Sequence, residues 1–180
     1  MVKIKDRIVL GIASGLLCSI PGRLFNKMQR ILGLTDLTYE QQAASIFVHR
    51  NQLDTAPSKI VGYVTNQFLA ASLGVVTAYL LSATGRDSAL VKGVGVSLTY
   101  WMLLEGLTRR LGLALPSRRA TSPFLSLLNH VIFGAFCGPV TAMLGDDRLF
   151  PEASGQIPSP FQGGYIDNGL EGKREPVPVI

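Results

Sequence analysis

Residues 89–107, ALVKGVGVSLTYWMLLEGL, decide the fold class of this chain. The helix they would form is apolar on every side and not along one stripe, which is typical of a helix surrounded by lipid or by other buried helices. The stretch contains a single acid, Glu105, four residues before Arg109. Three further apolar runs surround it in the sequence. The pattern therefore predicts an integral membrane protein.

Composition supports this class. Hydrophobic residues make up 47% of the 180 residues and charged residues only 16%, against about 25% charged in a typical soluble domain. The formal net charge is +5, and the basic residues flank the apolar runs. That arrangement favours membrane phosphates over nucleic acid as a partner. The two cysteines, Cys18 and Cys137, lie inside apolar runs and form neither a disulfide framework nor a metal-binding pattern.

The spacing of the apolar runs predicts an all-α bundle of four transmembrane helices, at about residues 8–25, 60–81, 90–111 and 124–144. Residues 1–20 resemble a signal peptide, but no small-residue cleavage site follows, so we expect a retained first span. Pro21 predicts a kink or the end of that span. These spans form a membrane domain of residues 1–148. Residues 149–180 are rich in proline and glycine, which predicts a mostly disordered tail.

One or two interfacial helices are expected between spans one and two, in residues 23–50. Apolar residues share one face of residues 23–32, and Arg23, Lys27 and Arg30 share the opposite face. Such a helix lies in the headgroup layer and contacts membrane lipids, anionic ones included. An ordinary helix packed under a loop is the alternative, and Gly33 is the predicted C-cap. A second helix should begin at Thr38, which forms a capping box with Gln41, and end near residue 49.

Small residues four apart recur within the predicted spans and allow helices to approach closely. The same faces are suited to a homo-oligomer or to a larger membrane assembly. The positions expected to pack in this way are Gly11, Gly15, Ala70, Gly74, Gly134 and Gly138.

Polar residues of three spans fall at a matching depth. Four crossings place the loops after spans one and three on one side. Counting 1.5 Å per residue from that side brings these residues to about 8–10 Å inside the membrane, except Arg109, which lies nearer the surface. The predicted polar layer consists of Asn66, Gln67, Glu105, Arg109, Asn129 and His130. One interpretation is a functional site, such as a proton-handling vestibule. The other is a structural pin, in which Glu105 pairs with Arg109 or reaches the interface and the remaining side chains hydrogen-bond across helices.

The distribution of basic residues predicts the topology. The connections after spans one and three hold nine of them: Arg23, Lys27, Arg30, Arg50, Lys59, Arg109, Arg110, Arg118 and Arg119. The opposite side holds six near the membrane: Lys3, Lys5, Arg7, Arg86, Lys92 and Arg148. The positive-inside bias therefore favours both termini outside.

No catalytic motif is present: there is no H-E-x-x-H, no G-x-S-x-G and no Walker loop. We therefore expect no enzyme, no cofactor and no metal site. A structural or accessory membrane component is the favoured function. A small transporter or channel subunit using the layer around Glu105 and His130 is the alternative, and an enzyme acting on lipids has the least support.

Four short motifs are similar to a known group of proteins. They are ATGRD at 83–87, KGVG at 92–95, NHVIFGAFCG at 129–138 and LGDDRLF at 144–150. Together they resemble an uncharacterised family of small four-span membrane proteins of Firmicutes-type bacteria. The resemblance covers about residues 3–150. It implies a multi-pass protein of the bacterial cytoplasmic membrane and implies no activity.

Overall fold

A computed structural model of the chain describes residues 3–113, 115 and 117–151. Over this range the protein is helical and contains no strand, apart from an isolated bridge between Ile4 and Gly145. The all-α prediction is confirmed for the described residues. The tail predicted at 149–180 lies outside them from residue 152 onward.

Within that range, three helices are long and apolar enough to cross a membrane: α1 (Arg7–Ile31), α3 (Ala56–Thr84) and α6 (Ser122–Leu144). At 1.5 Å per residue they measure about 35–44 Å, more than the hydrocarbon thickness of about 30 Å. α3 starts earlier than predicted because Pro57 occupies its first turn, where proline needs no hydrogen-bond partner.

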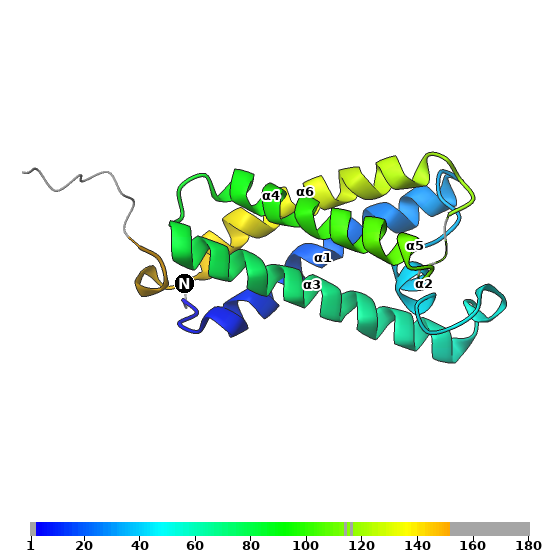
Figure 1. The fold of residues 1–180 in the computed structure, drawn as a ribbon. Coiled ribbons are helices and arrows are strands. Elements are labelled where there is room, and N and C mark those ends of the chain that lie inside the picture. The colour runs from blue at the N-terminus through cyan, green and yellow to red at the C-terminus, as the bar shows by residue number, and fades with distance from the viewer. Residues whose placement is uncertain (1–2, 114, 116, 152–180) are drawn as a thin grey trace, which may run out of the picture.

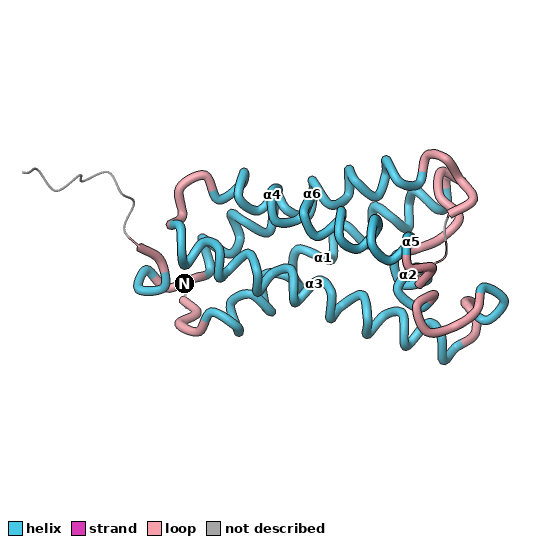
Figure 2. The backbone as a smooth tube through the Cα atoms, in the orientation of Figure 1, coloured by secondary structure: helices cyan, strands magenta, loops and turns pink. Residues whose placement is uncertain are grey.

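The long helices lie side by side and the chain reverses direction at each connection (Figure 1). Helix α1 packs on α3 and α6, and α6 also packs on α4 (Ala89–Trp101). Loops gather at the two ends of the bundle (Figure 2). We call the end with residues 32–55, 111–113, 115 and 117–121 the loop end. The end with residues 3–6, 85–88 and 145–151 is the turn end.

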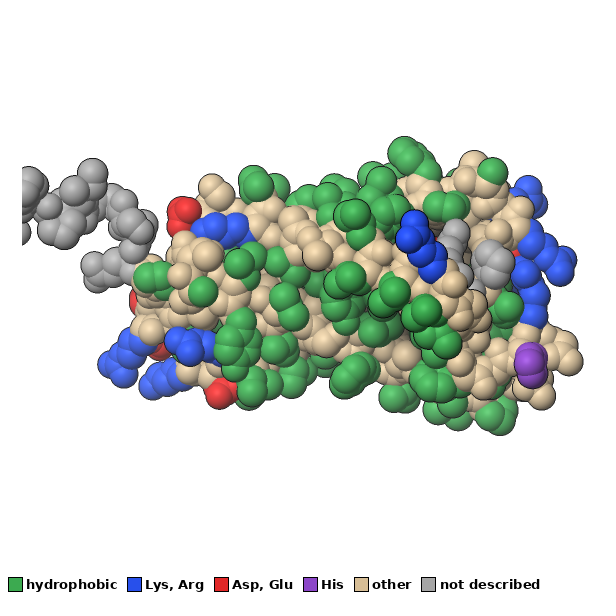
Figure 3. All heavy atoms as spheres, viewed as in Figure 1, with side chains coloured by type: hydrophobic (Ala, Val, Ile, Leu, Met, Phe, Trp, Pro, Cys, Tyr) green, Lys and Arg blue, Asp and Glu red, His purple; other side chains and the backbone are tan. Residues whose placement is uncertain are grey.

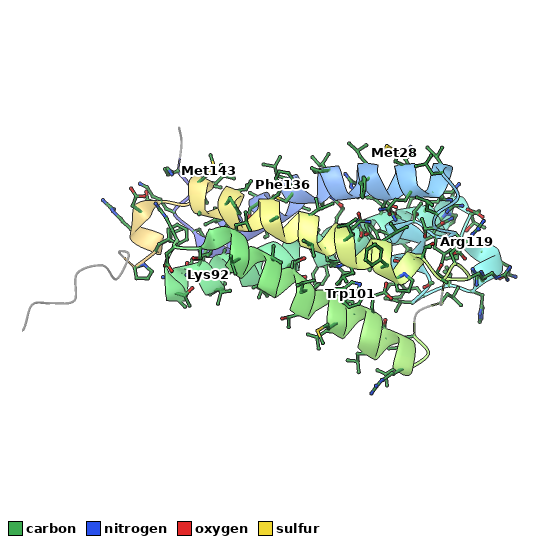
Figure 4. The ribbon with its side chains drawn as sticks, turned by 90° about the horizontal axis from the view of Figure 1, so that it is seen from above. Met28, Lys92, Trp101, Arg119, Phe136 and Met143 are labelled. Atoms are coloured by element: carbon green, nitrogen blue, oxygen red, sulfur yellow. The ribbon has the colours of Figure 1, made fainter. Side chains whose placement is uncertain are left out.

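The third predicted span is a composite helix. Helix α4 is followed without a break by a π-helical segment, η2 (Met102–Leu107), and by the short α5 (Thr108–Arg110). Figure 4 shows this stretch diverging from α6 beyond Trp101. Residues 89–110 therefore occupy the predicted place, but no single α-helix of spanning length forms there.

The separate interfacial helix predicted at residues 23–32 is instead the last part of α1. The helix continues through Pro21, because the face it buries continues past the proline with Gly22, Asn26 and Gln29. It ends at Ile31, and Gly33 two residues later has a φ of +71°. There the Gly33 amide donates to the Arg30 carbonyl and the Leu34 amide to the Gln29 carbonyl, the Schellman arrangement. The predicted cap at Gly33 is thus confirmed.

For the second helix of this region, the predicted start is confirmed and the predicted end is wrong. α2 (Tyr39–Ala44) carries the predicted capping box between Thr38 and Gln41. It ends at Ala44, well before residue 49, and a 3-10 turn, η1 (Arg50–Gln52), follows. Ile46 and Phe47, at 37% and 63% exposure, bury too little apolar surface to extend it.

The interior of the bundle is small and polar, whereas its outer surface is apolar. Ser14, Thr77 and Thr141 are at most 1% exposed, while Phe68 and Phe124 are 71% and 67% exposed. In Figure 3 hydrophobic side chains cover the middle of the visible face, and charged side chains gather towards the two ends. This distribution is typical of helices that pack against one another within lipid.

Glycines bring the backbones of two helix pairs into contact. Between α1 and α3, a Cβ on Gly74 would lie 2.7 Å from the Cα of Gly15, and a Cβ on Gly11 would meet the backbone of residue 75. Between α4 and α6, a Cβ on Gly134 would lie 2.7 Å from the Cα of Val94, and Gly138 meets Ala89. A Cβ added at Gly15 would similarly meet the carbonyl oxygen of Ala70. All six predicted small residues thus lie at helix–helix contacts.

The helical bundle also includes residues just beyond the predicted boundary at residue 148. A 3-10 turn, η3 (Asp147–Leu149), leads to Phe150, which is 7% exposed and packs with Leu10 and Leu81. The guanidinium carbon of Arg86 lies 4.3 Å from the centre of the Phe150 ring. An aromatic ring in contact with the apolar core explains why the first residues of the predicted tail belong to the bundle.

Candidate functional site

A cavity of about 160 Å³ lies among α1, α2, α3, the composite helix and α6, towards the loop end. A cavity of this size accommodates one small ring or a few water molecules. Its apolar lining comes mainly from leucine, alanine and phenylalanine. Its polar lining consists of Ser19, Arg23, Tyr39, Gln42, Asn66, Tyr100, Glu105, Thr108, Ser126, Asn129 and His130.

The cavity brings together four members of the predicted polar layer: Asn66, Glu105, Asn129 and His130. Gln67 does not line it, because neighbouring residues on a helix point about 100° apart. The side-chain oxygen of Gln67 is buried without a hydrogen-bond partner in the described part of the chain. The side chain of Arg109 lies outside the described residues, so its pairing with Glu105 stays a prediction.

Ser126 connects the composite helix to His130. Its hydroxyl donates to Glu105 Oε1 at 3.3 Å and accepts from Trp101 Nε1 at 3.2 Å. Its backbone carbonyl lies 2.8 Å from His130 Nδ1. Because a carbonyl only accepts, Nδ1 must carry the proton, and Nε2 is then an acceptor whenever the ring is neutral. The acid and the imidazole are thus joined through one serine.

Asn129 pairs with a residue that the sequence analysis missed. Its amide exchanges two hydrogen bonds with the amide of Gln29 in α1, at 3.1 and 3.3 Å, and each residue is 3% exposed. A reciprocal amide pair satisfies both side chains inside the bundle. The available signal was the i, i+3 spacing of Asn26 and Gln29, which puts two amides on one face of α1.

Tyr39, the first residue of α2, closes the cavity at the loop end. Its ring centre lies 6.3 Å from that of His130, with the planes at 77°. The Asn26 side chain holds its backbone amide at 2.9 Å. The Tyr39 hydroxyl is buried without a hydrogen-bond partner among the described residues. Burial raises the pKa of this phenol, so the hydroxyl stays neutral.

The three basic residues predicted to contact headgroups differ in their surroundings. Arg23 lines the cavity, and its guanidinium carbon lies 5.2 Å from the centre of the Tyr63 ring in α3. Lys27 is exposed, and Arg30 donates to the side-chain oxygen of Gln41. Of these three, only Arg23 reaches the interior.

The described residues contain no group of three or more His, Cys, Asp or Glu side chains that could hold a metal ion. The cavity combines one acid, one arginine, one histidine and several neutral hydrogen-bonding groups among the helices of the bundle. Fold and cavity together define a class of protein: a helical bundle with three helices able to span a membrane and a polar cavity near one end.

The amino-acid sequence matches no protein-family model and no curated protein, and the fold matches no solved structure. The resemblance to small four-span membrane proteins therefore stays a prediction that rests on the four motifs.

Proposed function

We propose that this chain is a four-span protein of the bacterial cytoplasmic membrane and serves as a structural or accessory component there. The direction of the chain supports the fourth crossing. α3 ends at the turn end, where Arg86 contacts the Gly145 carbonyl and Asp147. α6 begins at the loop end, where Ser122 contacts Thr35. The composite helix 89–110 must therefore return the chain along the bundle between two candidate spans.

One observation carries the functional part of the proposal: glycine contacts hold the helices beyond the cavity in two tightly packed pairs. Gly11 and Gly74 join the backbones of α1 and α3, and Gly93 and Gly134 join those of α4 and α6. Backbones in direct contact leave little room for a polar path between them. The cavity is therefore interpreted as a local pocket within a rigid scaffold, which favours a structural or accessory role.

A second candidate function is that of a small transporter or channel subunit. Glu105 and His130 lie in one cavity and are linked through Ser126. Ionisable side chains at this depth are typical of proton relays in membrane proteins. This arrangement supports transport only if protons reach Glu105 and leave it again.

Proton flux into liposomes separates the two functions. The purified full chain would be reconstituted in liposomes containing a pH-sensitive dye, alongside the Glu105→Gln variant and protein-free liposomes. We expect equal acidification rates in all three. A faster rate for the parent chain, abolished by Glu105→Gln without loss of thermal stability, would replace the structural proposal with transport.

The assembly role is tested by particle mass. A structural or accessory component should purify in mild detergent as a particle heavier than one 19.4 kDa chain with its detergent. A monomeric particle would count against that role.

A further inference from the structure

A second hollow lies on the outside of the bundle at the loop end. It is a groove of about 760 Å³ between the end of α1, α2 and the start of α3. We call it the α1–α3 groove. It is separate from the inner cavity except at Arg23, which lines both.

Charge in the α1–α3 groove is predominantly positive. Its four basic residues are Arg23, Lys27, Arg30 and Lys59, and its two acids are Glu40 and Asp54. Asp54 accepts a hydrogen bond from the Gln41 amide at 2.9 Å, whereas Lys27 and Lys59 are exposed. Two lysines on different helices therefore face a common hollow, which complements an anionic group.

Apolar side chains line the part of the groove nearer the middle of the bundle. On α1, Ile20 and Leu24 are 45% and 65% exposed and precede Lys27. On α3, Tyr63 is 47% exposed and follows Lys59 by one turn. Ile20 lies about 10 Å deeper than Lys27 at 1.5 Å per residue. Both helices thus place cations at the end and apolar surface deeper, which is the order of polar and apolar parts in a membrane lipid.

Arg23, which lines the groove, also carries an unsatisfied donor. The Nε of Arg23 is buried and has no hydrogen-bond partner among the described residues. Its guanidinium lies against the Tyr63 ring, which fixes it between α1 and α3. A phosphate oxygen is the acceptor that an arginine in this position binds most strongly.

We propose that the α1–α3 groove binds one anionic glycerophospholipid. Lys27, Lys59 and the arginines hold the phosphate, and the acyl chains lie along Ile20 and Leu24. A free phosphate would leave the apolar part of the groove empty. A zwitterionic lipid would bring its own ammonium group towards the lysines. This site rests on the proposed membrane location, but it does not depend on the structural role, because it uses the outer surface and not the cavity around Glu105.

Native mass spectrometry of the delipidated full chain tests the site. The probes are phosphatidylglycerol, phosphatidylcholine of the same chain length, and inorganic phosphate. The variant Lys27→Gln/Lys59→Gln removes two exposed charges from the groove. The matched control Arg118→Gln/Arg119→Gln removes two exposed charges from the same end, outside the groove.

We expect phosphatidylglycerol to form a one-to-one adduct that phosphatidylcholine does not form. Affinity should fall about 25-fold in the lysine variant, since each cation near an anionic lipid is worth about fivefold, and should be unchanged in the arginine control. Equal loss in both variants would show general surface attraction and overturn the site. Equal binding of phosphatidylcholine, or displacement of the lipid by inorganic phosphate, would overturn it too.

A further variant separates lipid binding from anion binding. Leu24→Asn keeps every charge and removes apolar contact from an exposed position, so the fold should be retained. Binding of long-chain phosphatidylglycerol should weaken, while the arginine control should still bind as the parent does. Unchanged lipid affinity in Leu24→Asn would contradict the assignment of the acyl chains.

Discussion

Ser126 contacts both an acid and a histidine, which come from different helical segments. Its hydroxyl binds Glu105 and its carbonyl binds His130 Nδ1. Depth counting placed Glu105 and His130 at one level, and the structure adds the serine between them. A serine in an apolar helix is common and gives no signal in the sequence, so this link was not predictable from residue type.

The link predicts coupling between the two side chains. Glu105→Gln and His130→Ala, made singly and together, should be non-additive in thermal stability in detergent. The coupling should be about 0.6 kcal/mol and at most about 1.7 kcal/mol, the range of hydrogen bonds between membrane helices. Repeating the cycle in a Ser126→Ala background should abolish it. Additivity in the parent background would show that the two residues do not communicate.

Asp36 joins three loop-end segments, and its ionisation should contribute to stability. Burial alone would raise the pKa of this carboxyl. Hydrogen bonds from the Ser117 hydroxyl and the Arg118 amide, together with the charge of Arg50 at 2.7 Å, outweigh burial and hold the pKa below its usual 3.8. The stabilisation is therefore present in full above that value and is lost as pH falls through the lower folded-state pKa.

Asp36→Asn should lower the free energy of unfolding by about 1 kcal/mol at neutral pH, since the carboxylate is partly exposed. The difference from the parent should shrink as pH is lowered from about 5 to about 2, because the parent carboxylate is then protonated as well. Thermal unfolding in a pH series measures this. Asp87→Asn, which breaks an exposed ion pair with Lys92, is the control and should change little. A difference that persists in acid would contradict the account.

Among the helices, the apolar runs predicted the positions of the long elements. They did not predict which face of the last part of α1 is buried in the bundle. The amphipathic pattern of residues 23–32 favours a helix in the headgroup layer, with a helix packed under a loop as the alternative. In the structure Leu24 and Met28 are 65% and 52% exposed, whereas Asn26 and Gln29 are buried. Lipid is as apolar as leucine, so burial in such a bundle selects small and hydrogen-bonding residues. The same periodicity therefore fits two opposite orientations.

The π-helical segment and the role of Tyr39 were also beyond sequence reasoning. Nothing in MLLEGL distinguishes a π turn from an α turn, because the difference depends on how the helix meets its neighbours. Tyr39 lies in a short helix outside the predicted spans, and only the folded loop brings it to His130. The contact between Tyr39 and His130 joins residues 91 positions apart in the sequence.

Two glycines in α4 provide a matched test of helix packing. A Cβ at residue 93 would lie 2.9 Å from the Cα of Gly138, whereas a Cβ at Gly95 would meet nothing within 4 Å. Gly93→Ala should therefore destabilise the bundle by about 1–3 kcal/mol through overpacking. Gly95→Ala should be neutral or stabilising by up to about 1 kcal/mol, since alanine is the better helix former. Thermal unfolding in detergent measures both, and equal effects would show that α4 and α6 do not meet as described.

In the whole molecule, the ion pairs place the basic residues at the two ends of the bundle that the topology prediction assigned to them. Asp36 binds Arg50 and the Arg118 amide at the loop end, and Arg86 binds Asp147 at the turn end. The side with nine basic residues is therefore one end of the bundle. The orientation of that end in the membrane stays a prediction.

Cysteine labelling tests the orientation. Thr84 and Ala120 are exposed at opposite ends, and the native Cys18 and Cys137 are buried, so background labelling should be low. An impermeant maleimide should label Thr84→Cys in intact cells and Ala120→Cys only after permeabilisation. The reverse pattern would place the termini inside.

The contacts between α1 and α6 join the first and the last long helix to be synthesised. The Ile4 amide donates to the Leu144 carbonyl and the Asp146 amide to the Ile4 carbonyl, both at 2.9 Å. Ser14 contacts Thr141, which lies 127 residues later in the chain. A nascent chain emerging from the ribosome therefore cannot form these contacts until α6 has been translated. During that interval the first helix is open to chaperones, to lipids and to other nascent helices.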